Sequence, residues 1–117
     1  MIDIVGIETL DDFIIKETDK KNIIMLYFGA TWCGPCKQLK KRLADKETIE
    51  TMEKLVVAHL DVDEDANSKL VKRYKVTSLP TQVLINLVDN KIVEIARIEG
   101  YDFTKLQLEY DKIVSKM

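Results

Sequence analysis

The sequence has little cysteine, proline, glycine or tryptophan: two cysteines, two prolines, four glycines and a single tryptophan among 117 residues. Small secreted domains that depend on disulfides carry several widely spaced cysteines, so the cysteine count excludes that class. No internal repeat, low-complexity tract or interdomain linker is present. With 46% apolar residues, the chain is predicted to be one domain over 1–117 whose core needs no metal or disulfide.

The chain also lacks an excess of charge of one sign and a long apolar run. Eighteen basic and twenty acidic side chains give a formal net charge of −2, which leaves no electrostatic footprint for nucleic acid or for a polybasic membrane contact. No stretch approaches the roughly 18 consecutive apolar residues of a membrane span. The N-terminus shows neither the basic start nor the apolar core of a signal peptide. We therefore expect a cytoplasmic monomer that binds neither nucleic acid nor membrane.

Hydrophobic patterning predicts alternating strands and helices that end in a hairpin and a last helix. Strand candidates are 2–5, 22–28, 55–62, 82–88 and 91–98, the last two joined by the turn residues Asp89 and Asn90. Helical spacing marks 9–14, 33–43, 66–74 and 103–117, with a further helical piece near 48–55. This order predicts an α/β fold, a mixed central sheet of about five strands flanked by about four helices.

The two cysteines, Cys33 and Cys36, stand two residues apart where a predicted buried strand gives way to a helix. A thiol at a helix N-terminus faces unpaired N–H groups and the positive end of the helix dipole, which favour the thiolate, the form that attacks disulfides. We therefore expect Cys33 to be the exposed nucleophile and Cys36, one turn later, the buried resolving thiol. Pro35 suits a first helical turn, and Gly34 leaves room beside Cys33 for a partner chain.

Two other interpretations fit the Cys-x-x-Cys pair less well. A structural zinc site needs four protein ligands, and beyond the two thiols only His59 and carboxylates remain. A purely structural disulfide across so short a loop would stabilise the chain little. We therefore expect a redox-active disulfide, with no metal and no cofactor, in a reducing compartment.

The segment Trp32-Cys33-Gly34-Pro35-Cys36-Lys37 resembles the active-site motif of the thioredoxin family in its reducing version. Ser78-Leu79-Pro80-Thr81 is similar to the second signature of that family, in which the proline is cis and packs against the cysteines. Gly100 matches the glycine that closes the substrate groove before the last helix. The resemblance covers nearly the whole chain.

This resemblance implies the thioredoxin fold and reduction of protein disulfides by dithiol exchange. The implied partners are disulfide-containing target proteins and a thioredoxin-reductase-type electron donor. The residues implied to dock the target are Trp32, Gly34, Pro35, Leu79, Pro80 and Gly100. An alternative interpretation of Pro80 is that it merely starts an edge strand.

Three positions depart from the family pattern. Tyr27 stands where most thioredoxins carry a buried aspartate, His59 stands where they carry a lysine on the neighbouring strand, and Lys41 replaces a helix-kinking proline. His59 is a candidate for proton transfer, since imidazole titrates near neutral pH. The alternative interpretation is a partly buried histidine whose hydrogen bonds are satisfied and which takes no part in catalysis. The stretch 40–53 is also similar to thioredoxin-like domains at the periplasmic end of transmembrane thiol reductases.

Two other functions stay open beside disulfide reduction. The first is a disulfide isomerase or oxidase, which would differ in its reduction potential. The second is a binding module that uses the fold to hold a partner protein, with the redox chemistry incidental.

Overall fold

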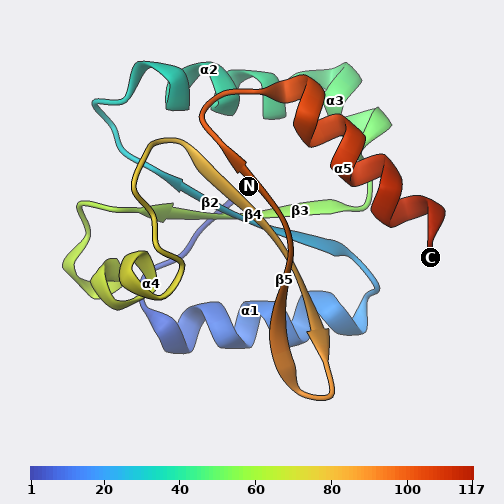
Figure 1. Ribbon diagram of the computed structural model, residues 1–117, viewed down its shortest axis with the longest axis horizontal. Coiled ribbons are helices and arrows are strands. Elements are labelled where there is room, and N and C mark those ends of the chain that lie inside the picture. The colour runs from blue at the N-terminus through green and yellow to red at the C-terminus, as the bar shows by residue number, and fades with distance from the viewer.

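The computed structural model describes residues 1–117 and contains one five-stranded mixed sheet (Figure 1). The strands are β1 (Ile2–Asp3), β2 (Ile23–Gly29), β3 (Leu55–Asp61), β4 (Thr81–Val88) and β5 (Lys91–Glu99). Their order across the sheet is β1-β3-β2-β4-β5, with β3 parallel to both β1 and β2, and β4 antiparallel to β2 and β5. The predicted fold class and number of strands are confirmed.

Helices cover both faces of the sheet (Figure 1). One face carries α1 (Ile7–Asp19) and α4 (Ser68–Arg73), which follows the 3₁₀ turn η1 (Asp65–Asn67), and the other carries α2 (Gly34–Leu43), α3 (Lys46–Thr51) and α5 (Phe103–Ser115). The fifth helix, α3, corresponds to the helical piece predicted near 48–55, and it begins separately because α2 ends at its C-cap Ala44. None of these helices has the length and apolar character needed to cross a membrane.

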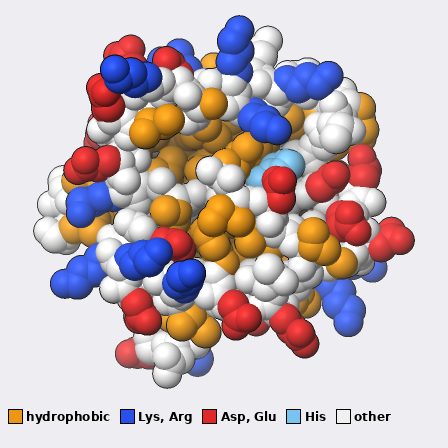
Figure 2. Space-filling model, turned by 180° about the vertical axis from the view of Figure 1, so that it is seen from behind, with side chains coloured by type: hydrophobic (Ala, Val, Ile, Leu, Met, Phe, Trp, Pro, Cys, Tyr) orange, Lys and Arg blue, Asp and Glu red, His pale blue; other side chains and the backbone are white.

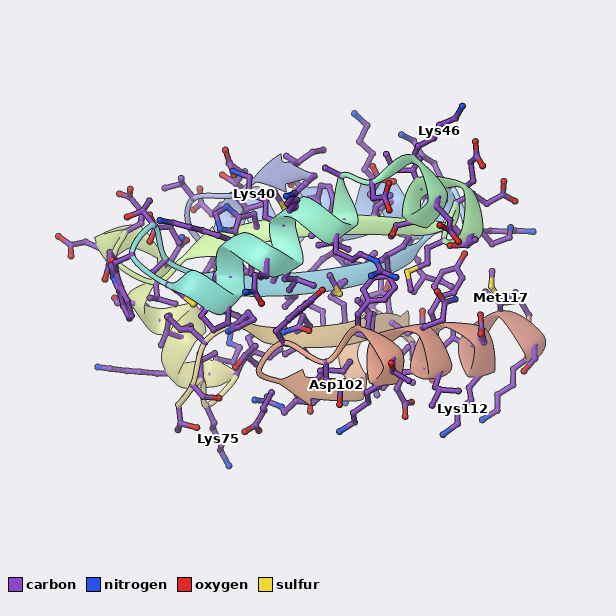
Figure 3. The ribbon with its side chains drawn as sticks, turned by 90° about the horizontal axis from the view of Figure 1, so that it is seen from above. Lys40, Lys46, Lys75, Asp102, Lys112 and Met117 are labelled. Atoms are coloured by element: carbon purple, nitrogen blue, oxygen red, sulfur yellow. A yellow bond between two sulfur atoms is a disulfide. The ribbon has the colours of Figure 1, made fainter.

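The central strand β2 divides the core into two clusters. All seven of its residues are buried, as the continuous apolar run predicted for a strand covered on both faces. Leu26 and Phe28 join the cluster under α1 and α4, whereas Met25 and Tyr27 join the cluster under α2 and α5. Figure 3 shows α2 and α5 side by side over the same face, where the Arg42 guanidinium lies 4.3 Å from the centre of the Phe103 ring.

The hairpin between β4 and β5 turns at the two predicted residues. Asp89 and Asn90 have φ of 52° and 65°, the left-handed pair that a type I′ turn requires. Further along, the register shifts between Leu84 and Ile85, which pair with Ala96 and Glu94. The β5 residue between Glu94 and Ala96 therefore has no partner on β4, which makes this position a β-bulge.

The bulge brings Glu94 and Arg97 to the same side of the sheet. Residues three apart on a regular strand point to opposite faces, but the extra residue cancels that alternation. Arg97 donates from Nη2 to Glu94 Oε1 at 2.9 Å and from Nε to Oε2 at 3.1 Å, and its Nη2 also donates to the carbonyl oxygen of Tyr74 at the end of α4. This guanidinium therefore ties the edge strand to α4.

Glu94→Gln is expected to lower the free energy of unfolding by less than about 1 kcal/mol at pH 7. The hydrogen bonds from Arg97 hold the pKa of the Glu94 carboxyl below its usual value. A lowered folded-state pKa gives stability that is present above the unfolded value and lost as pH falls through the folded one. Urea unfolding at pH 7, 5 and 3 should therefore show the largest gap between variant and wild type at pH 7 and a smaller gap as the pH falls. Glu50→Gln, at an exposed position of α3, is the control and should not separate; a gap that does not shrink between pH 7 and pH 3 would contradict the assignment.

Candidate active site

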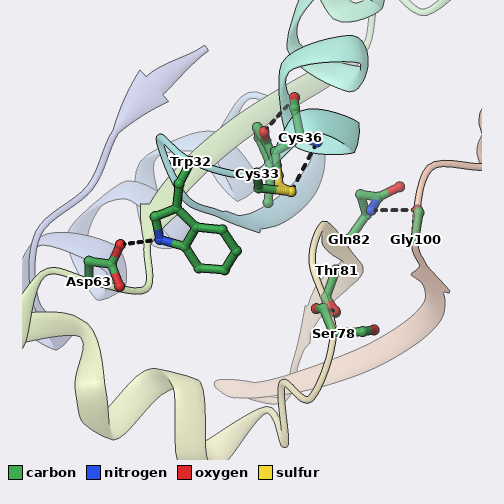
Figure 4. The surroundings of a disulfide bond; sticks show 9 residues. Trp32, Cys33, Cys36, Asp63, Ser78, Thr81, Gln82 and Gly100 are labelled. Atoms are coloured by element: carbon green, nitrogen blue, oxygen red, sulfur yellow. Dashed lines mark hydrogen bonds between the residues drawn. A yellow bond between two sulfur atoms is a disulfide. The ribbon is translucent and has the colours of Figure 1, made fainter.

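The end of β2 and the start of α2 place the two cysteines. Cys33 is the N-cap of α2, with extended backbone (φ −85°, ψ 113°), and its Sγ accepts a hydrogen bond from the Cys36 N–H at 3.2 Å. Cys33 and Cys36 are joined by a disulfide across a Cα–Cα distance of 5.2 Å (Figure 4). The N-cap position is the one that exposes a sulfur to the free N–H groups of the first helical turn.

Cys33 is more buried than the sequence predicted, whereas Cys36 is buried as expected. Cys33 is 5% exposed and Cys36 is 2% exposed, and both belong to the cluster under α2 and α5. The order of exposure is the predicted one, but in this disulfide form Cys33 offers only a small part of its surface to solvent. Cys33 does line an open hollow, described below, so an incoming sulfur has a route to it.

Trp32 stands out from the surface beside the pair. Its side chain is 68% exposed, and its indole Nε1–H donates to Asp63 Oδ2 at 2.7 Å (Figure 4). Asp63 follows β3, and its N–H donates to Asp61 Oδ1 at 2.9 Å, which steadies that loop. Sequence analysis missed Asp63, because 31 residues separate it from Trp32 and no motif contains both.

The loop before β4 forms the second wall of the site. The Leu79–Pro80 peptide bond is cis, as the family resemblance implied. Pro80 precedes β4, which lies between β2 and β5, so the interpretation that Pro80 starts an edge strand is wrong. The Pro80 carbonyl accepts from Gly100 N–H at 2.7 Å, and Gly100 has a φ of +87° that disfavours any other residue there.

A hollow of about 500 Å³ lies between these walls. Four of the six predicted docking residues, Trp32, Gly34, Pro35 and Leu79, line it together with Cys33. Pro80 and Gly100 lie outside its lining, and the backbone hydrogen bond between them ties the two loops together behind it. The remaining lining residues, which sequence analysis did not single out, are Val62, Val71, Val76, Thr77 and Ser78.

Two lining residues connect the hollow to the whole core. Val62 and Leu79 are partly buried, and each packs against both clusters, the one under α1 and α4 and the one under α2 and α5. Val62 directly follows β3, and Leu79 lies in the loop that leads into β4. The floor of the hollow is therefore continuous with the packing on both sides of the sheet.

Tyr27 and His59 lie side by side in the sheet beneath this region. Their rings are 4.8 Å apart, and the Tyr27 hydroxyl donates to the Cys36 carbonyl oxygen at 2.9 Å. Burial raises the pKa of the Tyr27 hydroxyl above its usual value. His59 instead pairs with Asp3, Nδ1 to Oδ1 at 2.8 Å, and makes no hydrogen bond to either cysteine.

Figure 2 shows His59 at the surface beside an acidic side chain and next to a depression floored by hydrophobic side chains. An apolar hollow of about 500 Å³ lies in this region, lined by ten hydrophobic residues that include Ile2, Met52 and Val57, and neither cysteine is part of it. No group of three or more His, Cys, Asp or Glu side chains capable of holding a metal gathers anywhere in the chain.

Gln82 is a second polar residue that the sequence analysis passed over. It is fully buried on β4 opposite Tyr27, and its Nε2 donates to the Gly100 carbonyl at 3.2 Å (Figure 4). Its Oε1 is the one buried side-chain polar atom without a hydrogen-bond partner. The available signal was weak, because Gln82 follows Thr81 at the polar start of β4 and precedes the apolar residues Val83, Leu84 and Ile85.

Once reduced to two thiols, a Cys-x-x-Cys pair at a helix N-terminus, beside a cis-proline loop and at the mouth of an open hollow, can exchange with the disulfide of another chain. The sulfur nearest the free N–H groups can carry negative charge, and the second sulfur lies within bonding distance of it. The fold and the site together define a thiol–disulfide oxidoreductase.

Comparison with known proteins agrees with this class. The family model described as Thioredoxin matches residues 5–109. Thioredoxin-1 of Drosophila melanogaster is 38% identical over 114 residues, which cover 93% of this chain and 96% of that protein. The chain belongs to the thioredoxin family, and it is a protein disulfide reductase.

Two further similarities concern the fold and a fused relative. The structure of Trichomonas vaginalis thioredoxin superimposes with a TM-score of 0.80 at 24% identity, covering 97% of this chain and 96% of that one, which shows the shared fold. The bifunctional thioredoxin reductase/thioredoxin of Mycobacterium leprae is 36% identical over 81 residues, which are 68% of this chain and 17% of that longer protein.

Proposed function

We propose that Cys33 is the attacking thiolate and Cys36 the resolving thiol in the reduction of protein disulfides. The Cys33 thiolate bonds to one sulfur of the target disulfide, and the other target sulfur leaves as a thiolate that takes up a proton. Cys36, after losing its proton, attacks Cys33 Sγ, forms the Cys33–Cys36 disulfide and releases the second target thiol. Two electrons and two protons pass from the dithiol to the target.

The order of attack rests on the N-cap geometry of Cys33. Its Sγ already accepts the Cys36 N–H at 3.2 Å, and a hydrogen bond of this kind strengthens when the acceptor becomes an anion. Cys36 lies deeper, at 2% exposure, and the sulfur within its reach is Cys33 Sγ. This geometry is the observation that carries the proposal.

The proposed docking surface is the wall formed by Trp32, Gly34, Pro35 and Leu79, with Pro80 and Gly100 behind it. Trp32 and Leu79 supply apolar contact, and Gly34 adds no side chain beside Cys33, at a position where an added Cβ would project into open space. An extended target segment beside Leu79 would pair with the peptide N–H and carbonyl groups of Leu79.

For the partners, we propose disulfide-containing proteins as targets and a thioredoxin-reductase-type flavoenzyme as electron donor, with the protein acting in the cytoplasm as a monomer. The fused Mycobacterium leprae relative supports the choice of donor, because its name joins a thioredoxin to a thioredoxin reductase. A proton-transfer role for His59 stays a prediction. Its hydrogen bond to Asp3 favours the alternative of a satisfied histidine.

The reduction potential of the Cys33–Cys36 bond tests the direction of the reaction. Trp32 is the only tryptophan and adjoins Cys33, so its fluorescence in dithiothreitol or glutathione redox buffers should follow this disulfide. We expect a potential near the reducing value of about −270 mV typical of thioredoxins. A value near the about −180 mV of protein disulfide isomerase would favour the isomerase or oxidase alternative. If the fluorescence shows no reversible transition, the binding-module alternative would be favoured.

A further inference from the structure

We propose that Tyr27 is a positioning residue for the redox pair, whose hydroxyl holds the backbone of Cys36 so that the Cys36 N–H stays aimed at Cys33 Sγ. The inference rests on the proposed role of Cys33 as the attacking thiolate. It gives a role to Tyr27, at the position where most thioredoxins carry a buried aspartate.

The contacts of Cys36 carry the argument. Its backbone is held at both ends: the N–H donates to Cys33 Sγ at 3.2 Å, and the carbonyl oxygen accepts from Tyr27 Oη at 2.9 Å. The two groups flank one Cα, so a restraint on the carbonyl also restrains the direction of the N–H. Tyr27 is 2% exposed and lies on the central strand β2. Because this strand is buried, the hydrogen bond from Tyr27 anchors the first turn of α2 to the sheet.

Gly29 makes room for this arrangement. A Cβ built at Gly29 would lie 2.9 Å from Cε1 and 3.0 Å from Oη of Tyr27, closer than side-chain atoms pack. Gly29 and Tyr27 lie two residues apart on β2 and so face the same side of the sheet. The tyrosine ring therefore leans over the glycine to reach Cys36, and the two residues form one unit.

A positioning task suits this hydroxyl better than proton transfer. Its proton is already donated to the Cys36 carbonyl, and burial raises the pKa of the phenol, so the group stays neutral. Its neighbours across the sheet are His59 on β3 and Gln82 on β4. His59 pairs with Asp3 and Gln82 with Gly100, so no carboxylate reaches Tyr27 to accept its proton.

The chemical effect is on the thiolate of Cys33. An N–H aimed at a sulfur stabilises the anion more than the neutral thiol, because the hydrogen bond becomes charge-assisted. Loosening the Cys36 backbone weakens that preference. The fraction of Cys33 present as thiolate at neutral pH then falls, while the thiolate that does form is somewhat more nucleophilic.

Tyr27→Phe tests this by the pH dependence of Cys33 alkylation with iodoacetamide in the reduced protein. At pH 7 the variant should react about three- to tenfold more slowly than wild type, the factor expected for part of one charge-assisted hydrogen bond. At a pH where Cys33 is fully ionised the variant should no longer be slower and should react at least as fast as wild type. Tyr110→Phe is the matched control: Tyr110 is 4% exposed in the same cluster, and its hydroxyl accepts from Lys54 N–H instead of touching a cysteine. Its profile should match wild type.

Gly29→Ala gives an independent route to the same result. The added methyl displaces the tyrosine ring from Cys36 while the hydroxyl remains in the chain, so alkylation at pH 7 should slow in the same direction. The double variant should show less than the sum of the two single effects, since both act through one contact. Wild-type alkylation profiles in both Tyr27→Phe and Gly29→Ala would overturn the inference. Failure of the proposed function would show separately, as a wild-type protein that turns over no disulfide although its Cys33 alkylates normally.

Discussion

Replacing Cys33 by serine is expected to abolish the reduction of protein disulfides, and replacing Cys36 by serine is expected to yield a protein that reacts with one target molecule and is then blocked. A serine hydroxyl at position 33 is not ionised near neutral pH and cannot attack sulfur, so turnover should fall by at least about a thousandfold. With Cys33 alone, the first exchange proceeds, but nothing displaces the target from Cys33 Sγ. The first result is measured as turnover of a disulfide-containing protein, the second as a covalent adduct on a non-reducing gel.

The double variant Cys33→Ser/Cys36→Ser is the control for the adduct. The chain has only these two cysteines, so the double variant should form none, whereas the adduct of Cys36→Ser should disappear on adding dithiothreitol. Normal turnover by Cys36→Ser would contradict the assignment of a resolving thiol. An adduct formed by Cys33→Ser but not by Cys36→Ser would mean that the two cysteines exchange roles.

Asn67→Ala is expected to lower the free energy of unfolding by about 3 kcal/mol, the loss of three partners for backbone groups at about 1 kcal/mol each. Asn67 is fully buried in η1. Its Oδ1 accepts the N–H of Gly6 at 2.8 Å, and its Nδ2 donates to the carbonyls of Ile4 at 3.3 Å and Asp61 at 3.1 Å. One side chain thus joins the entry to α1, the end of β3 and the turn before α4. Equilibrium urea unfolding measures the change.

Asn86→Ala provides the comparison for that experiment. Asn86 is exposed on β4, and its side chain accepts only the N–H of the next residue, Leu87, so its removal should change the free energy of unfolding by less than about 0.5 kcal/mol. Should Asn67→Ala prove as mild as Asn86→Ala, water would have to satisfy the three backbone groups in its place. The disulfide should be kept oxidised throughout, because its reduction changes the unfolded state.

The elements that sequence predicted well are those whose signal is local. The apolar run of β2 and the turn pair Asp89 and Asn90 each report on their own neighbourhood, and both lie where predicted. The Cys33–Cys36 pair is local as well, since two residues separate the sulfurs and the helix start fixes their geometry. Helix ends were predicted less accurately: α1 extends beyond the marked range 9–14, and the piece predicted near 48–55 is the short α3 that ends at Thr51.

The contacts that complete the site are long-range, and single-sequence patterns do not reveal them. Asp63 reaches Trp32 from 31 residues away, and Gln82 reaches Gly100 from 18. Tyr27 was visible in the sequence only as a departure from the family pattern. Its purpose emerged from the distance to the Cys36 carbonyl, which depends on how α2 settles on β2, and tertiary packing sets that distance.

The shared packing of Val62 and Leu79 has a consequence for how this protein behaves when a target is bound. Both side chains line the hollow and both belong to the packing of each sheet face. A polypeptide bound in the hollow covers the two side chains that contact both core clusters. A ligand that binds only the folded state stabilises it against unfolding. Slow amide hydrogen exchange should therefore spread from the hollow to α1 as well as to α2. A docked target therefore stabilises the fold of the protein that reduces it.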